Sequence, residues 1–231
     1  MLKGFIPKYI SNDTFIAFYE FLRKLGKALH GAYKRNEGDF RKALNDRQAL
    51  IRLKERTART SGYIEDQFNY SDLRYGKYSV GYCGCEVIAL YNALRSLKKL
   101  GTLEFKELLV EFERDGIVLS GKFGSSPKAI ADYLKKRGYR IETTTHIEEF
   151  EAVAGRSKTL ILVYYNDGRD ITKMVHTINI SKENDYRGEE AYVAHNAYTG
   201  GRASLPQRNI SELIASLAKG HAKGIYMIGI N

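Results

Sequence analysis

Cysteine, proline and tryptophan are scarce in this chain of 231 residues, which has two cysteines, three prolines and no tryptophan. Two cysteines cannot form the disulfide framework that stabilises small secreted domains, so we expect a cytoplasmic protein that folds on its hydrophobic core alone. Long apolar runs are also lacking. We find no apolar run typical of a signal peptide at the start and no stretch of about 18 apolar residues, and therefore expect no membrane span.

Basic residues outnumber acidic ones, and their excess is uneven along the chain. The net charge is +10, and residues 1–62 contain 14 Lys/Arg against 6 Asp/Glu, which accounts for +8 of it. Basic segments bind nucleic acid, anionic membrane surfaces or acidic partners. Because no motif here combines basic and aromatic residues as a nucleic-acid reader does, we expect no nucleic-acid partner and retain a membrane surface or a protein partner as the target of this segment.

Apolar residues recur at helical spacing in the first half of the chain. Residues 12–33 carry them three or four positions apart after the start signal Ser11-Asn12-Asp13, and a second such pattern follows Asn36. We therefore divide the chain into a basic helical arm, residues 1–62, and a larger domain, residues 63–231. Within that domain the spacing predicts helices from Cys85 to near Gly101, over 103–114 and over 127–138, the last opened by Ser126-Pro127.

After Gly138 the apolar pattern changes from helical to strand-like. Strands are predicted over 139–145, 160–165, 174–180, 191–194 and 225–230. Helices followed by strands are typical of an α+β fold. The segment between residues 60 and 82 shows no sustained period and is rich in tyrosine and glycine, so we interpret it as a loop that approaches Cys85 and lines a site.

Both cysteines lie in GYCGCEVIALYNAL, residues 81–94, directly before a helix. The N-terminus of a helix lowers the pKa of a thiol through its unpaired amides and its positive dipole end. Cys85 is therefore a candidate nucleophile. Such a thiol also needs a base within hydrogen-bond reach and a third group that orients the base.

Two of the five histidines lie in or at the end of predicted strands, where the backbone is rigid enough to hold a base. His176 is in the middle of an apolar strand, and His195-Asn196 ends the next one. If these strands are neighbours, Asn196 can reach the ring of His176. His195 remains an alternative base.

The order of these residues and elements resembles the papain-like cysteine peptidases, and most closely the bacterial branch that clips double-glycine leaders from bacteriocin precursors. The similarity covers roughly residues 75–230, and its most specific parts are CEVIALYNAL, GKFGSSPKAIADYLKKRGY, VHTINI and AHNAY. The resemblance implies a papain-like α+β fold in which Cys85 is the nucleophile, His176 the general base and Asn196 the residue that orients it. It implies a peptide or protein substrate and no cofactor.

Two positions depart from the family's pattern. Leader-clipping peptidases usually have Cys-Gly at the nucleophile, which fits Cys83 as well, so Cys83 is an alternative nucleophile. The family's oxyanion hole usually includes a glutamine a few residues before the cysteine, and here those positions are Tyr78, Ser79 and Val80. We name Ser79 and Tyr82, which lie close to these positions in the sequence, as oxyanion candidates. The resemblance also places the glycine-rich turn Gly121–Ser126 near the substrate groove, so Gly124 and Ser125 are groove candidates.

Other interpretations of the same residues remain open. The two cysteines could be ordinary buried thiols, or could bind zinc together with histidines, although the Cys-x-Cys spacing does not favour a structural zinc site and we expect no metal. The fold could serve acyl transfer or deamidation, or be an inactive scaffold that binds peptides. Residues 1–62 could inhibit the site or bind a partner.

Overall fold

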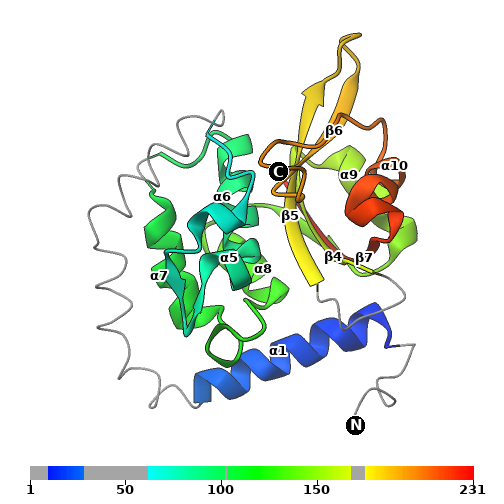
Figure 1. The fold of residues 1–231 in the computed structure, drawn as a ribbon. Helices are drawn as coiled ribbons and strands as arrows, with labels where there is room; N and C mark the ends of the chain where they lie inside the picture. Colours follow the sequence, from blue (N-terminus) through cyan, green and yellow to red (C-terminus); the bar gives the residue numbers. More distant parts are fainter. Residues whose placement is uncertain (1–9, 29–61, 102, 168–174) are drawn as a thin grey trace.

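The computed structural model describes residues 10–28, 62–101, 103–167 and 175–231. The predicted second helix after Asn36 lies outside these residues. Helices and an antiparallel sheet make up the described chain, which confirms the α+β class. Most helices lie on one side of Figure 1, and the sheet lies on the other side together with two further helices. Helix α1 (Asn12–Ala28) runs along one edge of both parts.

The helical part consists of α5 to α8 around α6 (Figure 1). Its helices are α5 (Val80–Cys83), α6 (Cys85–Ser96), α7 (Phe105–Asp115) and α8 (Pro127–Lys136). Local sequence explains their starts: Glu104 and Glu107 form a reciprocal capping box at α7, and Pro127 occupies the first turn of α8, where its missing N–H costs nothing. Nearly all of α6 is buried, so it is the central helix of the main core.

The sheet has five antiparallel strands in the order β3-β7-β4-β5-β6. Their bounds are β3 (Ile141–Thr144), β4 (Thr159–Tyr165), β5 (Val175–Asn184), β6 (Glu190–His195) and β7 (Lys223–Ile230). The central strand β4 is buried along its whole length, and its side chains alternate between two cores. Ile161 and Val163 join the core around α6, whereas Leu160 and Leu162 join a second core with α9 (Phe150–Arg156) and α10 (Ile210–Ser216).

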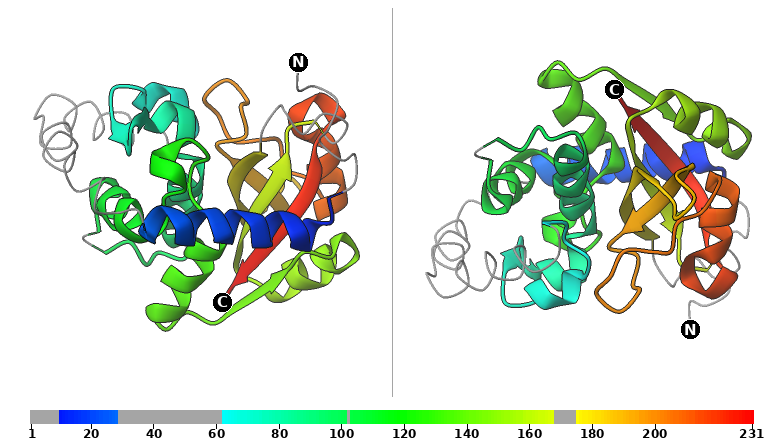
Figure 2. Two further views of the ribbon diagram at one scale, coloured as in Figure 1. Left: turned by 90° about the horizontal axis from the view of Figure 1, so that it is seen from below. Right: turned by 90° about the horizontal axis from the view of Figure 1, so that it is seen from above.

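Helix α1 (Asn12–Ala28) lies across the helical part and the sheet (Figures 1 and 2). At one end Asn12 donates to the backbone of Thr145, just after β3. At the other end Arg23 bonds Asp132 of α8. Three side chains on its inner face are buried, Ile16, Tyr19 and Leu22, so α1 packs on the domain as well as carrying basic charge.

The predicted loop between residues 60 and 82 contains short elements. These are η2 (Gln67–Tyr70), the two-residue strands β1 (Arg74–Tyr75) and β2 (Tyr78–Ser79), and α5. Two helices within the sheet half, α9 and α10, were not predicted either. Each has seven residues, which is too short for a helical period to stand out from the strands around it.

Candidate active site

Cys85 is the first residue of α6, and a sharp break between α5 and α6 places it there. Gly84 forms the break, and its amide bonds the carbonyl of Val80 at 2.8 Å. A Cβ at position 84 would lie 2.6 Å from a methyl group of Val80 and 2.7 Å from its carbonyl oxygen. Only glycine fits this close approach, so Gly84 allows the two helices to meet with Cys85 at the start of the second.

The Cys85 thiol is buried and points to an acid. Its Sγ donates to Oε2 of Glu86 at 3.3 Å. Burial raises the pKa of Cys85 well above its usual value and the charge of Glu86 raises it further, whereas the backbone amide of Thr177 lowers it. The thiol is therefore protonated while the site is closed in this way.

Glu86 is a site residue that the sequence analysis missed. Its side chain is 2% exposed, and burial raises the pKa of its carboxyl to about 7, although its own amide, the Cys85 thiol and the amide of Ser125 act to lower it. Gly124 makes room for this carboxyl, because a Cβ there would lie 2.7 Å from Oε2. The available signal was an acid in a helix whose first two turns are otherwise apolar.

Replacing Glu86 by glutamine is expected to change how stability depends on pH. The pKa of Glu86 is raised from 4.5 to about 7 on folding, so the contribution of Glu86 to the free energy of unfolding is fully present below pH 4.5 and is lost as the pH rises to 7. The fall is about 3 kcal/mol by proton linkage. Urea unfolding between pH 4 and 8 should show this fall in the difference between wild type and Glu86→Gln, because His176, whose pKa is lowered to about 4, contributes equally to both proteins. A difference that does not change with pH would contradict the raised pKa of Glu86.

His176 lies on β5, where that strand is not covered by β6. The register between the two strands begins at Asn179 opposite His195, so the edge of β5 at His176 and Thr177 has no β6 partner in the described ladder. The strands that carry His176 and His195 are neighbours, as expected. Tyr198 stacks on the His176 ring at 4.1 Å between centroids, and Tyr164 meets it edge-on at 5.7 Å.

The two ring nitrogens of His176 have different surroundings. Nε2 lies 2.6 Å from the carbonyl oxygen of Asn196. A carbonyl only accepts, so Nε2 carries the proton and Nδ1 has the lone pair in the neutral ring. Nδ1 is one of three buried side-chain polar atoms in the described residues that have no hydrogen-bond partner. Burial lowers the pKa of His176 to about 4, so the ring is neutral at pH 7.

Cys85 and His176 share one set of neighbours. The amide of Thr177, the residue after His176, is close enough to the Cys85 thiol to lower its pKa. Tyr164 and Tyr198 contact the His176 ring, and after burial Cys85 is the largest cause of the raised pKa of each tyrosine. The structure therefore brings the predicted nucleophile and the predicted base into one buried site between α6 and β5.

Asn196 meets His176 through its backbone and not through its side chain. The residue has a left-handed φ of 62°, which turns its carbonyl toward the ring. Its side chain bonds Gln67 instead: Oδ1 accepts from the Gln67 amide at 3.0 Å and Nδ2 donates to Oε1 at 3.2 Å. The expectation that an Asn196 side chain holds the ring does not describe this geometry, because Gln67 occupies that side chain.

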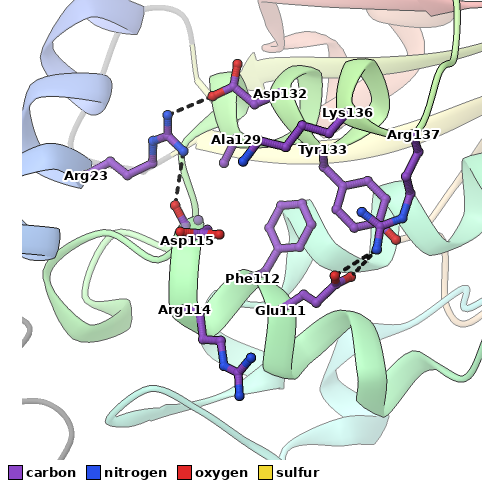
Figure 3. Close-up of a pocket in the computed structure, with 11 residues that line it drawn as sticks. Arg23, Glu111, Phe112, Arg114, Asp115, Ala129, Asp132, Tyr133, Lys136 and Arg137 are labelled. Atoms are coloured by element: carbon purple, nitrogen blue, oxygen red, sulfur yellow. Dashed lines mark hydrogen bonds and ion pairs between the residues drawn. The ribbon is translucent and has the colours of Figure 1, made fainter.

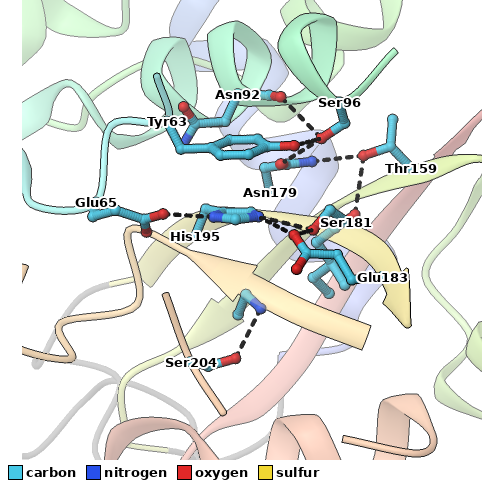
Figure 4. A network of polar contacts seen from close by, with 12 residues as sticks. Tyr63, Glu65, Asn92, Ser96, Thr159, Asn179, Ser181, Glu183, His195 and Ser204 are labelled. Atoms are coloured by element: carbon cyan, nitrogen blue, oxygen red, sulfur yellow. Dashed lines mark hydrogen bonds and ion pairs between the residues drawn. The ribbon is translucent and has the colours of Figure 1, made fainter. Parts of the chain in front are cut away.

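The two alternative residues are placed differently. Cys83 belongs to the main core, and its thiol lies near the carbonyl oxygens of Tyr75 and Ser79, 3.6 and 3.3 Å away. Burial raises the pKa of Cys83 as well. His195 has both ring nitrogens engaged: Nδ1 lies 2.7 Å from Glu65 and Nε2 lies 2.8 Å from Ser181 (Figure 4). The Cys83 thiol and both nitrogens of the His195 ring therefore have their own partners in the described residues.

The four oxyanion or groove candidates have different exposures. Gly124 and Ser125 are buried against Glu86, and the Ser125 hydroxyl bonds Tyr75, so these two residues support Glu86. Ser79 is half-buried at the start of α5. Tyr82 is 47% exposed and stacks on Tyr78 at 5.1 Å, which makes it the candidate most accessible to a ligand.

Helix α1 lies over the site. Tyr19 is buried, and after burial the charges of Glu86 and Cys85 are the largest causes of its raised pKa. Phe15 packs edge-on against Tyr165 of β4 at 5.4 Å. One face of α1 therefore closes the region around Cys85 to solvent.

A cavity of about 260 Å³ lies between α1, α7 and α8 (Figure 3). Neither Cys85 nor His176 is among the residues that line it. Its rim is largely charged, and ion pairs engage part of that charge, Arg23 with Asp132 and Arg137 with Glu111. This cavity is separate from the candidate active site.

In the described part of the chain, no group of three or more His, Cys, Asp or Glu side chains is arranged to hold a metal ion. No described helix is both long enough and apolar enough to cross a membrane. A scan against protein-family models finds no match, and a search of curated proteins finds no similar sequence. Residue chemistry alone therefore carries the argument about function.

Proposed function

We propose that this chain is a papain-like cysteine peptidase, a thiol hydrolase that cleaves a peptide or amide bond. Cys85 is the nucleophile, His176 the general base, and the Asn196 backbone fixes the ring of His176. The observation that carries the proposal is the His176 ring, whose Nε2 is held by a carbonyl and whose Nδ1 is buried and unpartnered beside a cysteine at a helix start. A base oriented in this way beside a thiol is the arrangement that nucleophilic catalysis needs.

The reaction follows from these positions. Nδ1 of His176 takes the proton of the Cys85 thiol as sulfur attacks the substrate carbonyl carbon, and the carbonyl electrons move to oxygen. The positive end of the α6 dipole stabilises that oxyanion. The carbonyl re-forms as the C–N bond breaks, and His176 returns the proton to the leaving amine. Water, deprotonated by the same nitrogen, then cleaves the thioester and restores the thiol.

Related reactions use the same first step. If an amine or alcohol replaces water, the product is an acyl transfer, and if the substrate is a side-chain amide, it is a deamidation. An inactive scaffold would bind peptides without forming the thioester. The raised pKa of Cys85 in the closed site is the observation that favours this last alternative.

A peptide-library digest tests the proposal. The full chain is incubated under reducing conditions with mixed synthetic peptides, with and without an added amine acceptor, and products are identified by mass spectrometry. New termini that depend on Cys85 support hydrolysis, and amine adducts support acyl transfer. If the wild type and Cys85→Ala give the same products, the peptidase proposal is wrong.

A further inference from the structure

The carbonyl that holds His176 is itself held by one short segment of the chain. Asn196 follows the end of β6 in a left-handed conformation, which costs free energy unless contacts fix it. Three of its polar groups bond residues of the predicted loop. The Asn196 amide donates to Oε2 of Glu65 at 3.2 Å, and its side chain makes two bonds with Gln67. The direction of the Asn196 carbonyl therefore depends on residues 65 to 67.

Glu65 connects two consecutive residues. Its Oε2 accepts the Asn196 amide, and its Oε1 lies 2.7 Å from Nδ1 of His195, which donates to that carboxylate oxygen (Figure 4). Tyr63 stacks on the His195 ring at 3.8 Å with 9° between the planes. Glu65 is 6% exposed and His195 is 2% exposed. A carboxyl group buried among these partners has little freedom, and neither does the peptide that it holds.

We propose that Glu65 is a positioning residue for His176, acting through the Asn196 backbone to aim the carbonyl that receives the Nε2 proton. The proposal rests on the proposed function, since the position of His176 matters for chemistry only if it is the base. Glu65 does not touch the reacting atoms. It replaces, from a distant part of the chain, the restraint that an Asn196 side chain would give if it bonded the ring directly.

Two substitutions of Glu65 test this role, one that removes its contacts to Asn196 and His195 and one that keeps them. Glu65→Ala removes both acceptors. Glu65→Gln keeps one carbonyl oxygen for the Asn196 amide, and its NH₂ group can donate to Nδ1 of His195 once that ring carries its proton on Nε2, facing Ser181. The conservative variant should therefore keep the position of Asn196.

Glu183→Gln is the matched control. Glu183 accepts from Ser181 on the far side of His195, at 3.0 Å, and in the described contacts it has no bond to Asn196. Like Glu65→Gln, the Glu183→Gln substitution replaces one carboxylate oxygen by an NH₂ group in the network around His195. It does not affect a residue that bonds Asn196.

The experiment measures the ring directly and the thiol separately. Nitrogen-15 labelled histidine reports the Nε2 proton of His176 by nuclear magnetic resonance, which requires no activity, and iodoacetamide labelling reports Cys85. We expect Glu65→Ala to shift or broaden the Nε2 proton signal and to slow turnover about 10- to 100-fold at constant KM. Glu65→Gln and Glu183→Gln should keep the wild-type signal and rate.

Several results would overturn the inference. One is an unchanged Nε2 proton signal in Glu65→Ala, and another is an equal change in Glu183→Gln. If Glu65→Ala does not fold, amide exchange of Asn196 in the wild type decides: protection equal to that of the β5–β6 ladder supports the inference, and exchange as fast as in an exposed turn overturns it. A signal that moves as expected in a protein without turnover supports the positioning role and refutes the peptidase proposal.

Discussion

Cys85→Ala abolishes turnover, whereas Cys83→Ala leaves it within about threefold of the wild type: this pair of variants has the largest expected effect. Cys85 supplies the sulfur of the covalent intermediate, and its removal should cost at least about 10³-fold in kcat, as for other nucleophiles. Cys83 is buried in the core with its thiol against two backbone carbonyls. Its loss should lower the free energy of unfolding by about 1 to 2 kcal/mol.

Steady-state kinetics on a cleaved peptide and urea unfolding together check this pair. Activity that survives in Cys85→Ala and is lost in Cys83→Ala would assign the nucleophile to Cys83. That result would mean that Cys83 leaves the core and reaches the substrate in the active enzyme.

Tyr19→Ala exposes Cys85 and raises its reactivity. Tyr19 is buried beside Cys85 and Glu86, and burial is the largest cause of the raised pKa of the thiol. Removal of the ring admits water, which lowers the pKa of Cys85. Each unit of decrease raises the thiolate fraction tenfold, so we expect iodoacetamide to label Cys85 at least about 10-fold faster at pH 8.

Two controls are available within the same chain. Phe18 is an aromatic residue on the outer face of α1 and is 54% exposed, so Phe18→Ala should label at the wild-type rate. Cys83 is an internal control, because it reacts only if the core opens. Equal labelling of Cys85 in Tyr19→Ala and Phe18→Ala would refute the covering role of α1, and so would equal acceleration at both cysteines, which would indicate unfolding.

The regular parts of the fold could be predicted from the sequence because their residues repeat at a fixed spacing. Helices at Phe105 and Pro127 and strands near Thr159 and Val175 follow from apolar period and capping, and their starts agree with the prediction to within a few residues. The helix that begins at Cys85 was predicted to continue to Gly101. It ends at Ser96, just before Lys98 adopts a left-handed φ of 55°, a conformation that no periodic pattern reveals.

The contacts around the candidate site depend on tertiary structure and could not be predicted in this way. Gln67 bonds Asn196, 129 positions along the chain, and no spacing in the sequence indicates that contact. Strand order places Asn196 near His176, but it does not determine the left-handed φ of Asn196, which turns the carbonyl and not the side chain toward the ring. Glu86 is an acid in the first turn of a helix, a common position that does not reveal burial. Glu86 is buried because the turn before α8, at Gly124 and Ser125, packs against its carboxyl, and that contact depends on tertiary structure.

The most direct test of the central claim, that His176 activates Cys85, is the rate of Cys85 labelling by iodoacetamide from pH 4 to 10 with and without His176. Both proteins carry Tyr19→Ala, so that the thiol is accessible, and mass spectrometry separates Cys85 from Cys83. The account predicts rapid labelling below the free-thiol pKa of about 8.5, slowed at least about 10-fold at pH 7 when His176 is replaced by alanine. Superimposable pH profiles for the two proteins would contradict it.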